Sequence, residues 1–148
     1  MPTTTYVESP EGPLVTVVAT PSALYCQYAL PTGTMRPDVA LLLLVDTGAS
    51  HCLIDESAIA PLGLHPVSAS LVNSTTTGRA AVIRPLYDLA LTIQHPDGST
   101  FREHDAVRVS TVQGFAHGRR YQGLIGRDLL DQAILNFDGP RQIFTLSY

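Results

Sequence analysis

The stretch LLLLVDTGASHCLI, from Leu41 to Ile54, ends a hydrophobic run on one carboxylate. The run Leu41–Val45 predicts a strand that is buried on both faces. Asp46 follows this strand directly, and burying a charge without partners is costly. Asp46 is therefore either a turn residue with satisfied hydrogen bonds or a residue whose position serves a chemical purpose.

The residues after Asp46 suit a rigid loop that a substrate backbone can approach closely. Gly48 is free to take backbone angles that other residues avoid, and Ala49 adds only a methyl group. The Thr47 hydroxyl can hydrogen-bond backbone groups and so fix the loop. This loop would hold a carboxylate at the floor of a cleft, although Asp-Thr-Gly alone also occurs in ordinary strand-end turns.

A second element downstream favours the chemical interpretation. Residues 123–130 read GLIGRDLL, which is an apolar pair followed by a glycine and a short helix. Both elements occur in this order in a chain that is otherwise rich in short strands. That combination is hard to attribute to chance.

The rest of the chain predicts an all-β sandwich or barrel in one domain. Eleven prolines and eleven glycines divide the 148 residues into short apolar segments. Turn sequences at residues 95–98 and 138–140 predict two hairpins. The predicted strands are Leu14–Thr20, Ala23–Leu30, Val39–Val45, Ala80–Ile83, Leu86–Gln94, Thr100–Ser110 and Gln142–Leu146.

Two short helices interrupt this pattern. Glu56–Leu62 follows Asp55, a suitable N-cap, and ends near Gly63. Arg127–Gln132 is long enough for only one or two turns. Residues 1–12 are expected to be a flexible tail, and residues 114–120 a mobile surface loop.

Composition excludes several function classes. The net charge is −4 and all nine basic residues are arginines, which argues against a nucleic-acid surface. Cys26 and Cys52 are too few for a disulfide framework or a thiolate zinc site, and Cys52 is expected in the core. The five histidines are scattered, so no metal site and no cofactor are predicted. No signal peptide or membrane-spanning segment is visible, and we expect a cytoplasmic protein without a membrane partner.

With its two elements, the sequence resembles the retropepsin-like aspartic proteases. The matching residues are Leu43–Ser50 and Leu124–Leu130, and Leu135–Leu146 is similar to the final hairpin of bacterial members. The resemblance runs from about Leu14 to the C-terminus. It implies a closed β-barrel or sandwich with one or two short helices and a flap hairpin, with residues 13–148 forming the protease domain.

The resemblance also implies roles for individual residues. Asp46 would be catalytic, and Thr47 would brace the two active-site loops against each other. The motif Leu124-Ile125-Gly126 would pack behind the active-site loop. The implied active-site loop is Thr47, Gly48, Ala49 and Ser50, and the implied supporting residues are Leu124, Ile125, Gly126, Arg127 and Asp128.

Arg127 departs from the pattern of the retroviral enzymes. In those enzymes an acidic residue pairs with this arginine, but Ser50 occupies the acidic position here. The alternatives for Arg127 are a pair with Asp55, a pair with Asp128, a contact with another subunit, or solvent.

Aspartic protease chemistry needs two carboxylates that share one proton, because like charges about 3 Å apart do not both ionise easily. This chain has one Asp-Thr-Gly. The second carboxylate is therefore expected from a second copy, which predicts a homodimer. The predicted function is an aspartic endopeptidase that hydrolyses peptide bonds in extended peptide or protein substrates.

A lid over the cleft is predicted between the apolar arms Val67–Leu71 and Ala80–Ile83. The predicted flap residues are Asn73, Ser74, Thr75, Thr76, Thr77 and Gly78. The alternative for this segment is an ordinary exposed hairpin turn.

The competing function is a catalytically silent version of the same fold, namely a dimerisation or peptide-binding module. The intact sequence Asp46-Thr47-Gly48 favours the protease, because a binding module has no need for a costly pair of carboxylates.

Overall fold

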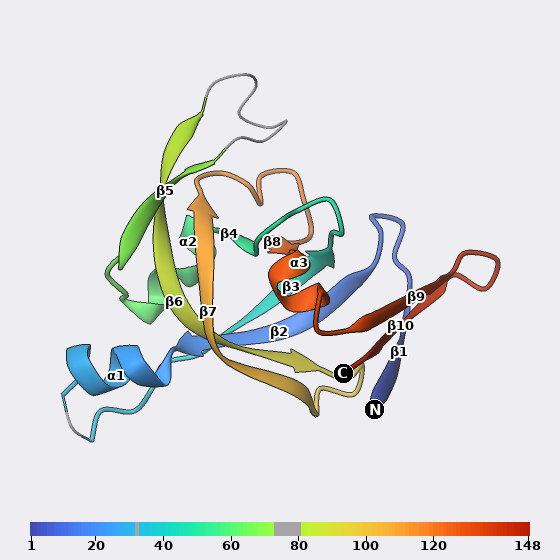
Figure 1. Ribbon diagram of the computed structural model, residues 1–148, viewed down its shortest axis with the longest axis horizontal. Helices are drawn as coiled ribbons and strands as arrows, with labels where there is room; N and C mark the ends of the chain where they lie inside the picture. Colours follow the sequence, from blue (N-terminus) through green and yellow to red (C-terminus); the bar gives the residue numbers. More distant parts are fainter. Residues whose placement is uncertain (32, 73–80) are drawn as a thin grey trace.

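The barrel is the main element of the computed structural model, which describes residues 1–31, 33–72 and 81–148 (Figure 1). Its strands lie in the order β2, β3, β8, β4, β7 and β6, and β6 pairs back onto β2 to close the ring. β5 pairs with residues 82–86 of β6, and β2 pairs with residues 89–93 of the same strand. The bounds are β2 Leu14–Pro21, β3 Val39–Val45, β8 Gly123–Ile125, β4 Leu53–Asp55, β7 Thr100–Val112, β6 Val82–Gln94 and β5 Ser68–Val72. The predicted all-β closed barrel is therefore confirmed.

Alternation along the strands fills the barrel with aliphatic side chains. In β3, Leu41, Leu43 and Val45 are buried, whereas Leu42 and Leu44 are half-buried. β3 pairs with β2 on one side and with β8 on the other, so it is central in the sheet. The prediction of burial on both faces thus holds fully for one face and partly for the second.

The two ends of the chain form a separate three-stranded sheet. β1 (Thr3–Val7) pairs antiparallel with β10 (Ile143–Ser147), and β10 pairs with β9 (Ile134–Asp138). We call this the terminal sheet. The Tyr6 ring stacks on Phe144 at 4.9 Å between centroids, and the Tyr6 hydroxyl donates to Gln94 O at 2.8 Å.

The expectation of a flexible tail over residues 1–12 is therefore wrong for most of that segment. Thr4 and Tyr6 are buried, and residues 3–7 are paired in register with β10. Residues 9–12 form a turn in which Ser9 and Gly12 bond to each other.

One predicted strand is a helix. Residues 23–30 were expected to be extended, but α1 (Ala23–Ala29) is helical and has no buried residue. Ser22 caps it, because its side chain accepts a hydrogen bond from Tyr25 N at 3.1 Å. The alternating hydrophobic residues that suggested a strand do not pack against the core. The N-cap at Ser22 therefore decides the local structure.

The other helices match the prediction. α2 (Glu56–Ile59) continues into a 3-10 turn, η1 (Ala60–Leu62), and Asp55 caps α2 by accepting from Ser57 N at 2.9 Å. Gly63 ends the segment in the left-handed conformation, with φ of 63°. α3 (Arg127–Leu130) lies within the second predicted helix.

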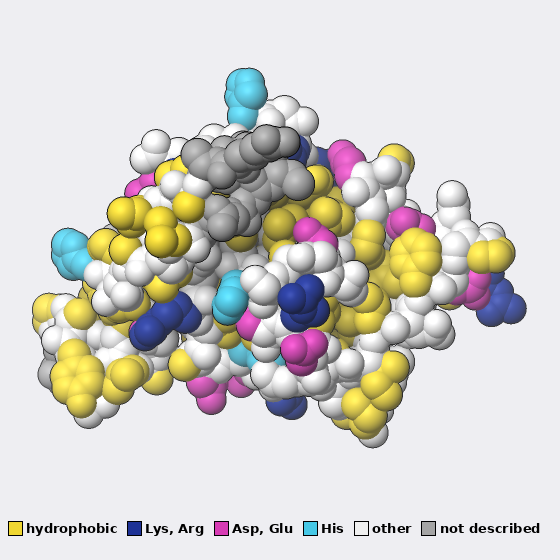
Figure 2. All heavy atoms as spheres, turned by 45° about the horizontal axis from the view of Figure 1, so that its top comes forward, with side chains coloured by type: hydrophobic (Ala, Val, Ile, Leu, Met, Phe, Trp, Pro, Cys, Tyr) yellow, Lys and Arg dark blue, Asp and Glu magenta, His cyan; other side chains and the backbone are white. Residues whose placement is uncertain are grey.

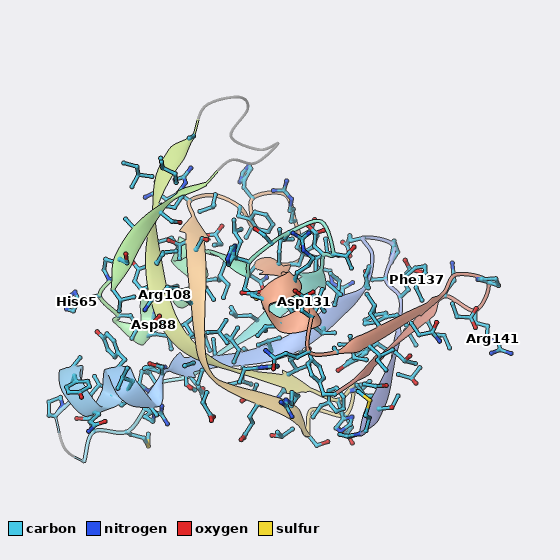
Figure 3. The ribbon with its side chains drawn as sticks, viewed as in Figure 1. His65, Asp88, Arg108, Asp131, Phe137 and Arg141 are labelled. Atoms are coloured by element: carbon cyan, nitrogen blue, oxygen red, sulfur yellow. The ribbon has the colours of Figure 1, made fainter. Side chains whose placement is uncertain are left out.

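Both predicted hairpins are present. β6 and β7 pair along their length around the turn at 95–98, and β9 and β10 join through the turn at 139–142. Asp88 and Arg108 face each other across β6 and β7, with two hydrogen bonds of 2.8 and 3.1 Å (Figure 3). Residues 113–122 connect β7 to β8 outside regular strands, where a surface loop was expected.

Candidate active site

Asp46 lies where β3 ends beside the parallel strand β8. Its backbone N–H donates to Ile125 O at 3.0 Å, so the end of β8 fixes the place where the loop begins. The Asp46 side chain is half-buried. Its Oδ1 accepts a hydrogen bond from Gly48 N at 2.8 Å, and its carbonyl accepts from Ala49 N at 3.2 Å. The carboxylate is therefore held by its own turn and is only partly removed from solvent.

The start of α3 holds the loop from the other side. Arg127 N donates to Ala49 O at 2.9 Å, and Asp128 N donates to Ser50 O at 3.3 Å. The Arg127 guanidinium donates from Nη1 to Thr47 O at 3.0 Å. Three residues of the loop, namely Thr47, Ala49 and Ser50, are thus bonded to the first two residues of α3.

Within the chain, Arg127 contacts Thr47 O rather than Asp55 or Asp128, the two partners in the same chain that the sequence suggested. A backbone carbonyl of the active-site loop receives the guanidinium, whereas Asp55 and Asp128 accept hydrogen bonds from other groups. Because Ser50 is too short and uncharged to pair with Arg127, the loop backbone takes the place of an acidic side chain.

Asp128 anchors the far end of the loop. Its Oδ2 accepts from Cys52 N at 3.0 Å, and its Oδ1 accepts from the Cys52 thiol at 3.2 Å. Cys52 is fully buried, as the sequence predicted. Burial raises the pKa of the Cys52 thiol, and the nearby Asp128 carboxylate raises it further. The thiol therefore stays protonated and acts as a hydrogen-bond donor.

Two glycines of β8 and its end allow this close packing. A Cβ built on Gly126 would lie 2.6 Å from His51 O and 2.8 Å from His51 Cα. A Cβ built on Gly123 would overlap Leu53 O and lie 3.0 Å from Ile54 Cα. Residues 123–126 thus pack directly against the backbone of residues 51–54, which follow the candidate active-site loop, at a distance that only glycine permits at either end.

Asp55 connects this region to the loop between β7 and β8. It is buried, and its carboxylate accepts hydrogen bonds from Ser57 N, from the Ser57 hydroxyl and, at 2.7 Å, from Ala116 N. Burial alone would raise the pKa of Asp55, but these hydrogen bonds together lower it below its ordinary value of 3.8. The ionised form is therefore the one that the folded chain stabilises.

An Asp55→Asn substitution is expected to lower the free energy of unfolding by about 2 kcal/mol at neutral pH, because an amide cannot accept from all three donors. The folded pKa lies below the unfolded value of 3.8, so the carboxylate stabilises the fold above pH 3.8. That contribution is lost as pH falls through the folded pKa. Urea unfolding at pH 6 and pH 3 measures the free energy of unfolding of both proteins. The difference between wild type and variant should be smaller at pH 3 than at pH 6. An equal gap at both pH values would contradict this account.

The side chains of Thr47 and Ser50 are exposed at the loop surface. Ser50 Oγ lies 2.9 Å from His51 Nδ1, so Ser50 interacts with its neighbour rather than with Arg127. Figure 1 shows that the loop after β3, the loop after β7, the last residues of β5 and the first residues of β6 lie at the same end of the barrel.

The arms of the predicted flap are paired strands. β5 and β6 are antiparallel, with Val72 opposite Val82 at the end of the described ladder. The predicted flap residues 73–78 themselves lie outside the described residues. In the parts of the chain that the structure describes, no group of three or more His, Cys, Asp or Glu residues is placed to bind a metal ion. None of the described helices has the length and apolar character needed to cross a membrane.

The comparison with protein families agrees with this geometry. A family model described as "Aspartyl protease" matches residues 33–129, which is more than half of the chain and includes both Asp46 and the end of β8. The chain belongs to the aspartyl protease family. A search of curated proteins found no match.

Among solved structures, this aspartyl protease chain is similar to the retropepsin-like aspartic protease from Rickettsia conorii. The TM-score is 0.58 at 16% sequence identity, and the match covers 99% of this chain and 90% of that chain. The foamy viral protease–reverse transcriptase, solved with an RNA/DNA hybrid, matches with a TM-score of 0.42 at 12% identity, over 80% of this chain and 12% of that one. The first match shows that the fold is retropepsin-like, which confirms the resemblance seen in the sequence.

Proposed function

We propose that this chain is an aspartic endopeptidase whose active site forms when two copies associate about a twofold axis. The observation that carries the proposal is the single Asp-Thr-Gly loop, held by β8 and α3, in a chain of the aspartyl protease family. The carboxylates of Asp55 and Asp128 accept hydrogen bonds from other groups of the same chain. A second carboxylate for Asp46 therefore comes from the second copy.

In this proposal one Asp46 carboxylate acts as general base on a water molecule, while the protonated carboxyl group of the second copy donates to the scissile carbonyl. The water oxygen bonds to the carbonyl carbon as its proton passes to the base. The C–N bond then breaks, and the departing amine takes a proton from the pair.

The substrate of this site is an extended peptide that pairs its backbone with the protein, as in strand addition. Gly48 gives the peptide backbone room beside the Asp46 carboxylate. Thr47 reaches from each loop toward the loop of the other copy, and the hairpin of β5 and β6 covers the peptide. Apolar side chains on both sides of the cut fill pockets that the strands line.

Dilution of the wild-type protein is expected to lower its specific activity, because monomers hold half of each site. The measurement is cleavage of a fluorogenic peptide library at mildly acidic pH over a concentration series, with sedimentation velocity on the same samples. The fall in activity should follow the fall in the dimer fraction. Constant specific activity in samples that sediment as monomers would refute the shared site, and an inactive dimer would favour the peptide-binding module.

A further inference from the structure

A groove of about 420 Å³ lies between β7 and α3. β7 contributes residues 102–104 and 106–108 to it, and Asp128 and Gln132 line the side of α3. His104, Val107 and Leu129 are buried at its base. Figure 2 shows basic, acidic and histidine side chains close together in the middle of the molecule. The groove therefore combines a buried base with polar walls.

One side of β7 has no strand partner along this groove. β4 pairs with β7 only at residues 110–112, and β6 occupies the opposite side of β7. Ser110 N donates to Cys52 O at 3.1 Å, so the Ser110 backbone faces β4. Backbone groups two residues apart point to the same side of a strand. The N–H and C=O of Arg108 therefore also point away from β6.

The hydrogen bonds around Asp88 agree with this direction. Asp88 lies opposite Arg108 on β6, and its carbonyl accepts from Ser22 N at 3.4 Å. The Arg108 guanidinium is held by the Asp88 carboxylate, so the side chain does not cover the edge of its own strand (Figure 3). Among the described residues, the edge at Arg108 thus presents a backbone donor and a backbone acceptor without a strand partner.

Asp128 keeps this edge open. If the parallel ladder of β4 and β7 continued by one more bond, Cys52 N would donate to Arg108 O. Cys52 N instead donates to the Asp128 carboxylate at 3.0 Å. The residues before β4 are therefore held toward α3, and the groove opens beside β7.

We propose that this groove binds a segment of the substrate several residues away from the cut, by pairing the backbone of that segment with the edge of β7. Strand addition draws its affinity from main-chain hydrogen bonds, so it accepts many sequences. The inference rests on the proposed function and deepens it, because it gives the same peptide substrate a second place to bind.

The position of the groove favours the substrate as its occupant. His51 lines the groove and directly follows the loop Thr47–Ser50. His51 thus joins the candidate active-site loop to the groove, and one extended peptide can contact both. A segment paired with β7 there lies in line with β4, ahead of its first residue, Leu53.

A bulge in β7 limits the length of the paired segment. The register with β6 shifts between Leu89 and Leu91, which lie opposite Val107 and His104. The extra residues interrupt the edge at this point. Pairing is therefore confined to a few residues around Arg108, and it adds affinity to a substrate that is also held at the Asp46 loop.

The test is an Ala106→Trp protein. Ala106 is exposed and lines the groove, so an indole there fills the space that the segment needs. With casein as a long unfolded substrate, KM should rise at least about fivefold, because the distal segment loses its ladder. With a short fluorogenic peptide that ends a few residues from the cut, kcat/KM should stay within about twofold of the wild-type value. The matched control is Ala29→Trp, at an exposed alanine that ends α1, and it should behave like the wild type with both substrates.

A binding measurement separates the groove from the chemistry. The fluorescence anisotropy of labelled casein reports its binding to the Asp46→Asn protein, with and without Ala106→Trp. The dissociation constant should be higher in the protein that carries both substitutions. If the wild type cleaves neither substrate while this difference persists, the proposed function fails and the groove stands.

Two kinetic outcomes would overturn the groove while leaving the proposed endopeptidase standing. They are an equal loss with casein and with the short peptide, and no loss with either. Sedimentation velocity of the Ala106→Trp protein should show the wild-type dimer fraction. A lower fraction would assign the groove to a second copy of the chain and would overturn substrate binding there.

Discussion

An Asp46→Asn protein is expected to lose at least about a thousandfold in peptide cleavage, because an amide can neither take a proton from water nor share one with its twin. The amide oxygen can still accept from Gly48 N, the contact that the Oδ1 atom makes now. The loop should therefore keep its shape, and the loss should appear as chemistry rather than as unfolding. The measurement is kcat/KM on a fluorogenic peptide, with circular dichroism to verify the fold.

Asp131→Asn is the matched control. Asp131 is exposed, follows α3 and loses the same charge on substitution (Figure 3). Its activity should equal that of the wild type. Activity in the Asp46→Asn protein close to that of the control would exclude this carboxylate from the reaction.

Mixing wild-type and Asp46→Asn chains tests the shared site directly. With equal amounts and free exchange, statistical assembly leaves about a quarter of the dimers with two intact carboxylates. Activity should fall to about a quarter of the activity of the same total amount of wild-type protein. A protein that works as single chains would keep about half, and that result would contradict the dyad.

A Gly126→Ala substitution is expected to lower the free energy of unfolding by about 3 kcal/mol and to abolish most activity. The added methyl would meet His51 O at 2.6 Å and His51 Cα at 2.8 Å. These are backbone atoms of the residue that directly follows the candidate active-site loop, so relief requires the loop and α3 to move apart. That movement breaks the bonds from Arg127 and Asp128 to the loop and displaces Asp46.

Gly139→Ala is the matched control, because its Cβ would make an ordinary contact of 3.6 Å with the Phe137 ring. Thermal unfolding and peptide cleavage of both variants should be measured together. The Gly126 variant should unfold at a lower temperature and cleave little, while the Gly139 variant stays close to wild type. Equal stability of the two variants would show that the loop yields more easily than its hydrogen bonds indicate.

The sequence predicted the strand that ends at Asp46 and the motif behind it, since both depend on local patterns of apolar and small residues. It also predicted Asp55 as a cap. The failures were at residues without a local signal. β1 pairs with β10, which is at the opposite end of the chain, and a threonine-rich segment shows little of this by itself. α1 depends on a cap at Ser22 and contributes nothing to the core, so hydrophobic alternation was a poor guide.

The hydrogen bonds that support the candidate active site were predicted only in part. Arg127 was recognised, but its partner is the carbonyl of Thr47, and a backbone atom leaves no trace in residue identity. Asp128 was predicted as a supporting residue, and Cys52 was assigned to the core. The hydrogen bonds that join them became visible only when three-dimensional packing brought the two residues together.

The pairing of the first strand with the last has a practical result for measurement. Each polypeptide fastens its own two termini, from Thr3 opposite Ser147 to Val7 opposite Ile143, without borrowing a strand from a neighbour. Folding of the isolated subunit and assembly are then separate equilibria, and each can be titrated without the other. Under the proposed function, dilution would therefore leave subunits that keep their fold and lack only the second half of the site.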